Sequence, residues 1–499
     1  MTIVARTLIL TIRAVPWVLF SVLLLSFIEF ITSLDIQPQW LFSLEHRTTV
    51  GTIIIYWSLF ECIFFLYRIY HQRHLPSRTK WTNTKDERAE TFRRCFDHLP
   101  TPDAWLGWFL DAQLCDIQFD NIAEWLCFAL FNLSMTELQY HPNTIDLTKE
   151  LHHYIQLIEE KMDHKFPPGY NDKVTSMRLN LDHVPPLHRP LLIYLVISLL
   201  DTFSQLQLFY KGYTHFVPDV STGCRSYFPP TISYVPGLFR SSGSTLHYWY
   251  RPPTDPSQRG RAVVFVGGIG AGIYGAKHAI VRIAESSPGS PTYIVDNLAV
   301  GMRYVNYVPT PEETLEGVEK MLNRSERSDC VFIGLSLGST LGAWLIRMKP
   351  SMVTHCIMVD PVCFMLHLPD VAYNFVYKQP KTANDWVRWY FVGREETVLS
   401  FLRNHFIWNR NILWKDQVPQ GGRSAVFLSE EDSISPVHHV WTELTGRDVP
   451  RDDGRGVYID EGNITTHWNF GLKHGQSMFI KRSKDIVVRL GTQFAKENG

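Results

Sequence analysis

The chain has 499 residues and a formal net charge of −1. This length is enough for two or three domains with a sizeable core, and the balanced charge argues against nucleic acid or another strongly charged partner. The eight cysteines are scattered, with no Cys-x-x-Cys spacing, which is typical of a reduced compartment. We therefore expect no disulfide framework, no metal and no cofactor.

Two apolar stretches open the chain. Residues 14–34 carry one charge, Glu29, and residues 48–67 carry one charge, Glu61. Each stretch has about 20 residues, enough for a helix to cross roughly 30 Å of hydrocarbon. A cleaved signal peptide would have a shorter apolar centre and a small-residue cleavage site. The sequence therefore predicts a transmembrane hairpin within residues 1–75.

Basic residues flank this hairpin on one side. Arg6 and Arg13 precede the first span and Arg68 follows the second, whereas the connecting loop holds Arg47. Lysine and arginine prefer the cytoplasmic side. We therefore expect both termini and the rest of the chain in the cytoplasm, on an endomembrane such as the endoplasmic reticulum. We also expect Arg13 to pair with Glu61 and to fix the hairpin.

Residues 76–225 show helical patterns. Apolar and aromatic residues recur at helical spacing in 104–110 and 122–128, and further helices are expected at 151–162 and 190–200. The apolar run in the last of these is too short to span a membrane. We expect the aromatic faces to pack on the following domain. The alternative is a surface that lies on the membrane interface.

From residue 226 onwards strands alternate with helices. Helices are expected at 276–284 and 312–322, the second after the start signal Thr310-Pro311. This alternation predicts an α/β fold, with a mostly parallel sheet and helices on both faces. The expected strands are 245–250, 262–266, 292–295, 330–333, 356–359, 424–428 and 457–460.

A Gly-x-Ser-x-Gly motif lies between an expected strand and an expected helix. Ser336 is its serine, and Gly334 and Gly338 are its glycines. A serine on such a tight turn is exposed, and the glycines leave room for the helix and for a substrate. The two could also be ordinary turn glycines, because chance supplies this motif in roughly one chain in ten of this length. The interpretation of Ser336 as a nucleophile therefore depends on whether the chain also offers a base and an acid.

A nucleophilic serine needs a base and an orienting acid. Asp432 follows the expected strand 424–428, and His474 lies in a later loop-like stretch. An imidazole with an ordinary pKa near 6.5 can shuttle protons at neutral pH. The predicted catalytic residues are therefore Ser336, Asp432 and His474, in this chain order.

Other residues compete for these roles. Asp360 follows the strand before that of Asp432 and could be the acid, but the distance from Asp432 to Pro436 favours Asp432. Glu430 and Glu431 are the next candidates for the acid. His467 is a weaker candidate for the base, and we expect it to be a packing or surface residue.

Residues 245–499 resemble an α/β-hydrolase, in which the triad runs Ser, Asp or Glu, His along the chain. The stretch 263–270 is similar to the oxyanion loop of this family, with Gly267 where a histidine is usual. The resemblance implies that the backbone N–H groups of Ile269 and Leu337 form the oxyanion hole. It also implies an esterase-like or lipase-like serine hydrolase.

A second motif points elsewhere. Residues 270–275 have the pattern Gly-x-Gly-x-x-Gly, and Asp296 closes the next expected strand. Together they suggest a dinucleotide-binding oxidoreductase. However, Gly270 follows the strand end at Val266 by four residues, whereas such a glycine should come directly at the strand end. We therefore favour the hydrolase and keep the oxidoreductase as the alternative.

Residues 361–421 form a long aromatic-rich insertion before the strand that carries the acid. We expect a helical cap here, with Trp386, Trp389 and Phe391 as candidates for contact with substrate. The expected division is a hairpin (1–75), a helical segment (76–225) and a hydrolase domain (226–499). The predicted protein is a membrane-anchored serine hydrolase that cleaves an acyl bond of a lipid. The sequence is also compatible with an acyltransferase that uses the same triad and with a non-catalytic membrane scaffold.

Overall fold

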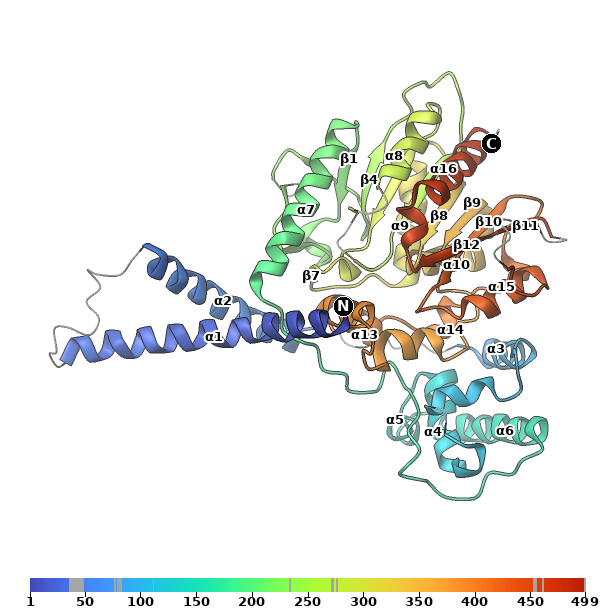
Figure 1. The fold of residues 1–499 in the computed structure, drawn as a ribbon. Coiled ribbons are helices and arrows are strands. Elements are labelled where there is room, and N and C mark those ends of the chain that lie inside the picture. The colour runs from blue at the N-terminus through green and yellow to red at the C-terminus, as the bar shows by residue number, and fades with distance from the viewer. Residues whose placement is uncertain are drawn as a thin grey trace.

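An α/β body carries a projecting helical hairpin on one side and a group of helices beneath it (Figure 1). The structure is a computed structural model. The residues that it describes are 1–35, 49–75, 78, 83–110, 112–232, 235–270, 273–274, 277–451, 456–459 and 462–497.

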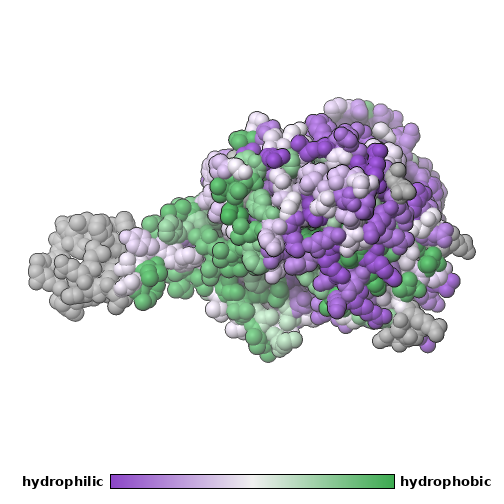
Figure 2. Space-filling model, turned by 90° about the horizontal axis from the view of Figure 1, so that it is seen from above, coloured by the Kyte–Doolittle hydropathy of each residue, from purple (hydrophilic) through white to green (hydrophobic). Residues whose placement is uncertain are grey.

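The hairpin consists of α1 (Thr2–Asp35) and α2 (Thr49–Arg73), in agreement with two long apolar helices at the N-terminus. Trp17 of α1 packs edge-on against Phe65 of α2. Figure 2 shows hydrophobic residues on the hairpin and on the neighbouring side of the body. Three helices in the described part of the chain are long and apolar enough to cross a membrane: α1, α2 and α7 (Leu191–Tyr210). The loop between α1 and α2 lies outside the described residues.

Glu61 of α2 is buried, but its partner is not the one expected. Its carboxylate accepts a hydrogen bond from the backbone N–H of Leu191 at 2.9 Å and lies 3.2 Å from Nε2 of His188. The first N–H groups of a helix have no partner within the helix and attract a carboxylate. The start of α7 therefore takes the place that we predicted for Arg13, and that prediction is wrong.

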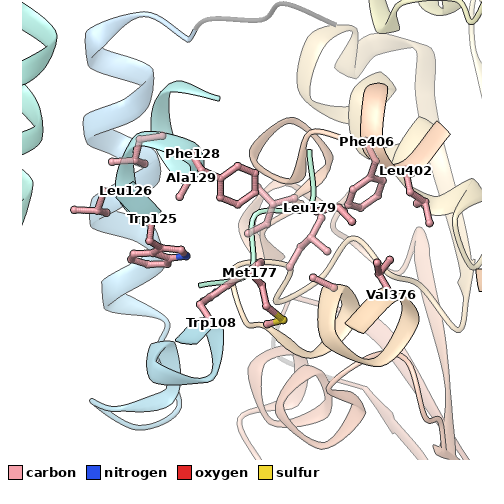
Figure 3. Close-up of a cluster of buried hydrophobic side chains, with 14 of the residues drawn as sticks. Trp108, Trp125, Leu126, Phe128, Ala129, Met177, Leu179, Val376, Leu402 and Phe406 are labelled. Atoms are coloured by element: carbon pink, nitrogen blue, oxygen red, sulfur yellow. The ribbon is translucent and has the colours of Figure 1, made fainter. Parts of the chain in front are cut away.

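The helical segment packs on the rest of the chain through its aromatic faces, as predicted. Trp108, Phe128 and Leu179 belong to one buried cluster with Leu402 and Phe406, which lie in residues 361–421 (Figure 3). The helix at its end, α7, has 20 residues and is much longer than expected. The other helices are α3 (Lys85–Asp97), α4 (Phe119–Phe131), α5 (Met135–Gln139) and α6 (Thr144–Met162).

The body is built on a sheet of ten strands in which the six from β12 to β6 are parallel and β4 and β11 run antiparallel to their neighbours. The predicted mostly parallel sheet is thus confirmed. In sheet order its strands are β11 (Val457–Ile459), β12 (Ile464–Lys473), β10 (Ser424–Glu431), β9 (Val353–Val359), β8 (Cys330–Leu335), β5 (Ala262–Val266), β6 (Thr292–Asp296), β4 (His247–Arg251), β1 (Thr214–Val217) and β3 (Phe239–Ser241). A separate pair is β2 (Ser226–Phe228) and β7 (Tyr304–Val305).

Helices cover both faces because the strands are apolar on both sides. Val263 and Phe265 of β5 pack with α8 and α16, whereas Val264 packs in the opposite cluster with α9, α10 and α15. This alternation follows from the two-residue period of a strand. The helices are α8 (Lys277–Ser286), α16 (Lys481–Lys496), α9 (Pro311–Asn323), α10 (Gly338–Met348) and α15 (Val437–Thr445).

Some elements differ from expectation. The sequence analysis did not predict β12. This ten-residue strand contains His467, and His474 directly follows it. The sheet includes β1, which precedes the expected domain boundary at residue 226. The division into three domains stays a prediction. Residues 361–421 contain the helices α11 (Asp370–Ala372), α12 (Ala383–Arg388), α13 (Glu396–Asn404) and α14 (Trp408–Asn411), and the π-helical turns η8 (Tyr373–Tyr377) and η9 (Trp389–Gly393).

Candidate active site

Ser336 lies on the turn from β8 to α10, with a left-handed backbone at φ 51°. Only a few per cent of residues other than glycine adopt such a backbone, and it costs conformational energy. A side chain at Gly338 would overlap the carbonyl oxygen of Val266, and a Cβ at Gly334 would come within 2.8 Å of the Phe332 ring. The two glycines are therefore required by close packing around Ser336 and are not ordinary turn glycines.

The structure brings Ser336, His474 and Asp432 into one hydrogen-bonded chain. The Ser336 Oγ lies 2.7 Å from His474 Nε2, and His474 Nδ1 lies 2.7 Å from Asp432 Oδ2. The other carboxylate oxygen of Asp432 accepts hydrogen bonds from the backbone N–H groups of Ile434 and Ser435, at 2.8 and 3.1 Å. The acid is thus fixed by the loop after β10, and in turn it fixes the imidazole.

Asp360 occupies a different place beside the same histidine. Its Oδ2 accepts a hydrogen bond from the backbone N–H of Gly475 at 2.8 Å. Burial raises the pKa of Asp360 to about 6. The carboxylate at the imidazole Nδ1 is therefore that of Asp432, and Asp360 holds the loop that follows β12.

The surroundings of His474 set its pKa. Burial lowers the pKa of the imidazole, but the charge of Asp432, with a smaller contribution from Asp360, raises the pKa above its ordinary value. His467, the rival base, is buried and stacks on Phe427 with ring centroids 4.3 Å apart. Burial lowers the pKa of His467 to about 4, so it is a packing residue, as predicted.

Arg388, which the sequence analysis did not single out, binds the loop that carries Asp432. Its guanidinium donates hydrogen bonds to Ser433 Oγ at 2.6 Å, to the Ser433 carbonyl at 3.0 Å and to Asp385 at 3.1 Å. Ser433 directly follows Asp432. Arg388 thus connects the acid loop to the helices of residues 361–421, a long-range contact with no local sequence signal.

The predicted oxyanion residues lie around the serine. Gly268 is so close that a Cβ there would come within 2.8 Å of the Ser336 Cβ. Ile269 and Leu337 both line the cavity at Ser336, whereas the N–H of Gly270 donates to the carbonyl of Val300. The use of the Ile269 and Leu337 N–H groups as oxyanion donors stays a prediction.

A largely apolar cavity of about 330 Å³ opens on one side of Ser336. This volume is at the lower end of the range for ligand pockets. Its walls come from two parts of the chain that lie far apart in sequence (Figure 3). The helical segment contributes Trp108, Phe128, Leu179 and Asn180, and residues 361–421 contribute Val362, Leu366, Val371, Ala372, Phe375, Val376, Asn384, Val387, Arg388, Val392, Leu402, Phe406 and Trp408.

The aromatic residues named as substrate contacts are not among these walls. Val387 of α12 and Val392 of η9 line the cavity instead. The guanidinium of Arg6 in α1 lies over the Trp386 ring, 5.9 Å from its centroid. Contact with substrate stays a prediction for the three aromatic residues, Trp386, Trp389 and Phe391.

A second cavity, of about 370 Å³, lies on the other side of Ser336 and also touches His474. Its lining is more polar and includes the glycine-rich loop, the end of β6 and the loop after β12. The residues are Phe265, Gly267, Gly268, Ile269, Gly270, Ile273, Tyr274, Val295, Asp296, Asn297, Gly301, Leu335, Gly475, Gln476 and Phe479. Residues 271, 272, 275 and 276, within and beside the Gly-x-Gly-x-x-Gly pattern, lie outside the described residues, so the dinucleotide alternative stays untested.

The strand–turn–helix at Ser336, the parallel sheet and the chain order of the three residues are those of the α/β-hydrolase fold. Such an arrangement can activate a serine hydroxyl for attack on a carbonyl carbon. The hydroxyl can pass its proton to the imidazole, and the carboxylate stabilises the imidazolium that forms.

No protein-family model and no curated protein matches the sequence. Solved structures with similar folds include an esterase from Pyrobaculum calidifontis, at 13% identity over 64% of this chain and 94% of that chain, with a TM-score of 0.34. A second is 2-hydroxy-6-oxo-6-phenylhexa-2,4-dienoate hydrolase from Rhodococcus, at 15% identity over 50% of this chain and 96% of that chain, with a TM-score of 0.35. A third is a bacterial membrane phospholipase A, at 13% identity over 60% of this chain and 94% of that chain, with a TM-score of 0.35. These scores are low, so the fold assignment depends on the strand order and the turn at Ser336.

Proposed function

We propose that this protein is a membrane-anchored serine hydrolase that cleaves a carboxylic ester or related acyl bond of a lipid. The observation that carries the proposal is the hydrogen-bonded chain of Ser336, His474 and Asp432 at the mouth of an apolar cavity. The solved structures with similar folds are named as hydrolases and esterases, which agrees with a hydrolase.

In the proposed reaction Ser336 Oγ attacks the carbonyl carbon while His474 Nε2 takes its proton. The tetrahedral oxyanion is stabilised by the N–H groups of Ile269 and Leu337. His474 then gives the proton to the leaving alcohol, and an acyl-enzyme remains on Ser336. A water molecule, deprotonated by His474, cleaves this acyl-enzyme and restores the serine. An alcohol in place of this water would make the protein an acyltransferase.

The apolar cavity supports a lipid substrate. Its walls are mainly aliphatic and aromatic, and they begin at the serine, where the carbonyl of an ester would lie. An acyl chain in this cavity is removed from water, which is favourable by about 0.8 kcal/mol for each CH₂ group. The helices of residues 361–421 would then act as the cap over the chain.

The hairpin supports delivery of that lipid from a bilayer. The helices α1 and α2 meet the length and composition requirements for membrane spans. We propose that they cross an endomembrane such as the endoplasmic reticulum, with both termini and the body in the cytoplasm. The basic residues at the body end of the hairpin support this orientation.

Fluorophosphonate labelling of the full-length protein in membranes tests the proposal. We expect a probe adduct on Ser336, mapped by peptide mass spectrometry, and strongly reduced labelling in His474→Ala because the serine loses its base. Heat-denatured wild type is the control for non-specific labelling. Folded protein that takes no label, or that takes it on another residue, would overturn the proposed nucleophile.

A further inference from the structure

One face of α7 exposes a continuous row of apolar side chains. Its six members recur at three- and four-residue spacing along the whole helix, and each is at least 47% exposed. We call them the α7 stripe: Leu192, Val196, Leu199, Phe203, Leu206 and Tyr210. A helix that is exposed to water on one side normally has polar residues there. The stripe therefore requires an apolar environment outside the body.

The opposite face of α7 is fixed in the body by buried polar contacts. Asp201 pairs with Arg303, Ser204 Oγ accepts a hydrogen bond from Lys277 Nζ at 2.8 Å, and Tyr194 donates one to Glu395 at 2.8 Å. A helix held in this way cannot leave the body to cross a bilayer. Although α7 is apolar enough to be a span, it must stay at the surface of the body.

The hairpin shows where this surface lies relative to a bilayer. Leu191, which starts α7, is bound to Glu61 of α2, so the stripe starts at the level of Glu61. The helix from Thr49 to Glu61 is about 18 Å long, which is short of the roughly 30 Å of a hydrocarbon core. A bilayer that α2 crosses must therefore extend past Glu61 and meet the start of α7.

Figures 1 and 2 agree with this placement. Figure 1 shows α7 running crosswise to the hairpin along the side of the body from which the hairpin projects. Figure 2 shows hydrophobic residues that continue from the hairpin onto this side. We propose that the α7 stripe is a membrane-docking surface, with α7 lying parallel to the bilayer plane and the stripe in contact with the acyl chains. This inference rests on the proposed membrane anchor.

Such docking would direct one entrance of the active site towards the lipid. Lys277 Nζ lies over the rings of Phe203, in the stripe, and of Tyr274, at 5.6 and 4.5 Å. Tyr274 and the exposed Phe479 line the second cavity, which leads to Ser336. The docked stripe therefore places this cavity beside the membrane surface, and a lipid has a short path to the serine.

Photo-crosslinking of the full-length protein in vesicles of phosphatidylcholine and phosphatidylserine tests the docking. The photoreactive p-benzoylphenylalanine replaces Leu199 or Phe203 in the stripe, Ile53 on α2, or Val457 on β11. Ile53 and Val457 are also exposed, and β11 is the edge strand at the end of the sheet far from β1 and β3. We expect lipid adducts at Leu199, Phe203 and Ile53, and at least about tenfold fewer at Val457.

Adducts at the stripe as rare as those at Val457, with abundant adducts at Ile53, would overturn the docking but leave the anchor. Crosslinks from Phe203 to a second protein chain would overturn it in favour of a protein partner. A lack of adducts at Ile53 as well would overturn both the anchor and the docking. The fluorophosphonate label on Ser336 reports on the hydrolase separately from all of these outcomes.

Discussion

The two sides of Ser336 differ in what they can hold. On one side, aliphatic and aromatic side chains from the helical segment and from residues 361–421 enclose an apolar cavity. On the other side, backbone of the glycine-rich loop, with Asp296 and Asn297, lines a more polar cavity. We propose that an acyl chain lies on the first side, while the leaving group and the attacking water use the second. Ser336 itself lines both cavities.

The largest effect is expected for Ser336→Ala, because the variant has no nucleophile at the junction of the two cavities. We expect kcat/KM on an activated ester to fall on the order of 10⁵-fold. Ser339→Ala is the matched control, since Ser339 lies at the start of α10, directly after the turn, and its Oγ donates to the Ser336 carbonyl at 2.6 Å. This control should lose less than about tenfold. Equal losses in the two variants would mean that the turn, and not the hydroxyl, matters.

The two carboxylates beside His474 should differ strongly. Asp432→Asn is expected to lower kcat on the order of 10⁴-fold, because an amide favours the wrong imidazole tautomer. Asp360→Asn keeps an oxygen for the Gly475 N–H and should lose less than about tenfold. Steady-state kinetics on the two purified variants, with thermal unfolding as a check of folding, measures the difference. The reverse ranking would make Asp360 the acid.

Substrate selectivity should change when the apolar side is filled. Ala372 lines this cavity, so Ala372→Phe removes space for an acyl chain. We expect kcat/KM for a dodecanoyl ester to fall by about tenfold to a hundredfold relative to a butyryl ester. Asn297→Leu, on the polar side, is the matched control and should leave this ratio unchanged. A ratio that changes only in the control would reverse the assignment of the two sides.

The smallest effect concerns pH. His474 must be neutral to accept the serine proton, so activity should fall as the pH drops through its pKa, which lies above 6.5. Asp360 is mostly ionised there, because its own pKa is about 6. Its charge raises the pKa of His474, so Asp360→Asn should shift the acidic limb of kcat/KM to lower pH. A limb that moves upwards would contradict this electrostatic role.

Local patterns were sufficient for the catalytic strand ends. The runs before Ser336 and Asp432 are largely apolar. Their strands β8 and β10 begin at the predicted residues, 330 and 424, and extend past the predicted ends. The helix predicted to start after Thr310-Pro311 does start there, and the structure adds a capping box in which the Thr310 side chain accepts a hydrogen bond from the Glu313 N–H. These features depend on a few neighbouring residues, which is why the sequence alone predicts them.

Features that depend on distant parts of the chain were not predictable. Leu179 and Trp108 line the apolar cavity only because the helical segment folds onto α13, where Asn180 Nδ2 donates to the Arg403 carbonyl at 2.8 Å. Arg388 meets the acid loop across more than forty residues of sequence. Val392, which lines the cavity, lies in the π-helical turn η9, and no residue type predicts such a turn.

The acyl-enzyme is the most direct test of the central claim that Ser336 is the nucleophile of a hydrolase. Full-length protein in detergent is mixed with p-nitrophenyl dodecanoate and quenched in acid during turnover, and its peptides are then weighed. We expect a dodecanoyl group on Ser336, absent from Ser336→Ala. Turnover with the acyl group on another residue, or full turnover by Ser336→Ala, would contradict it.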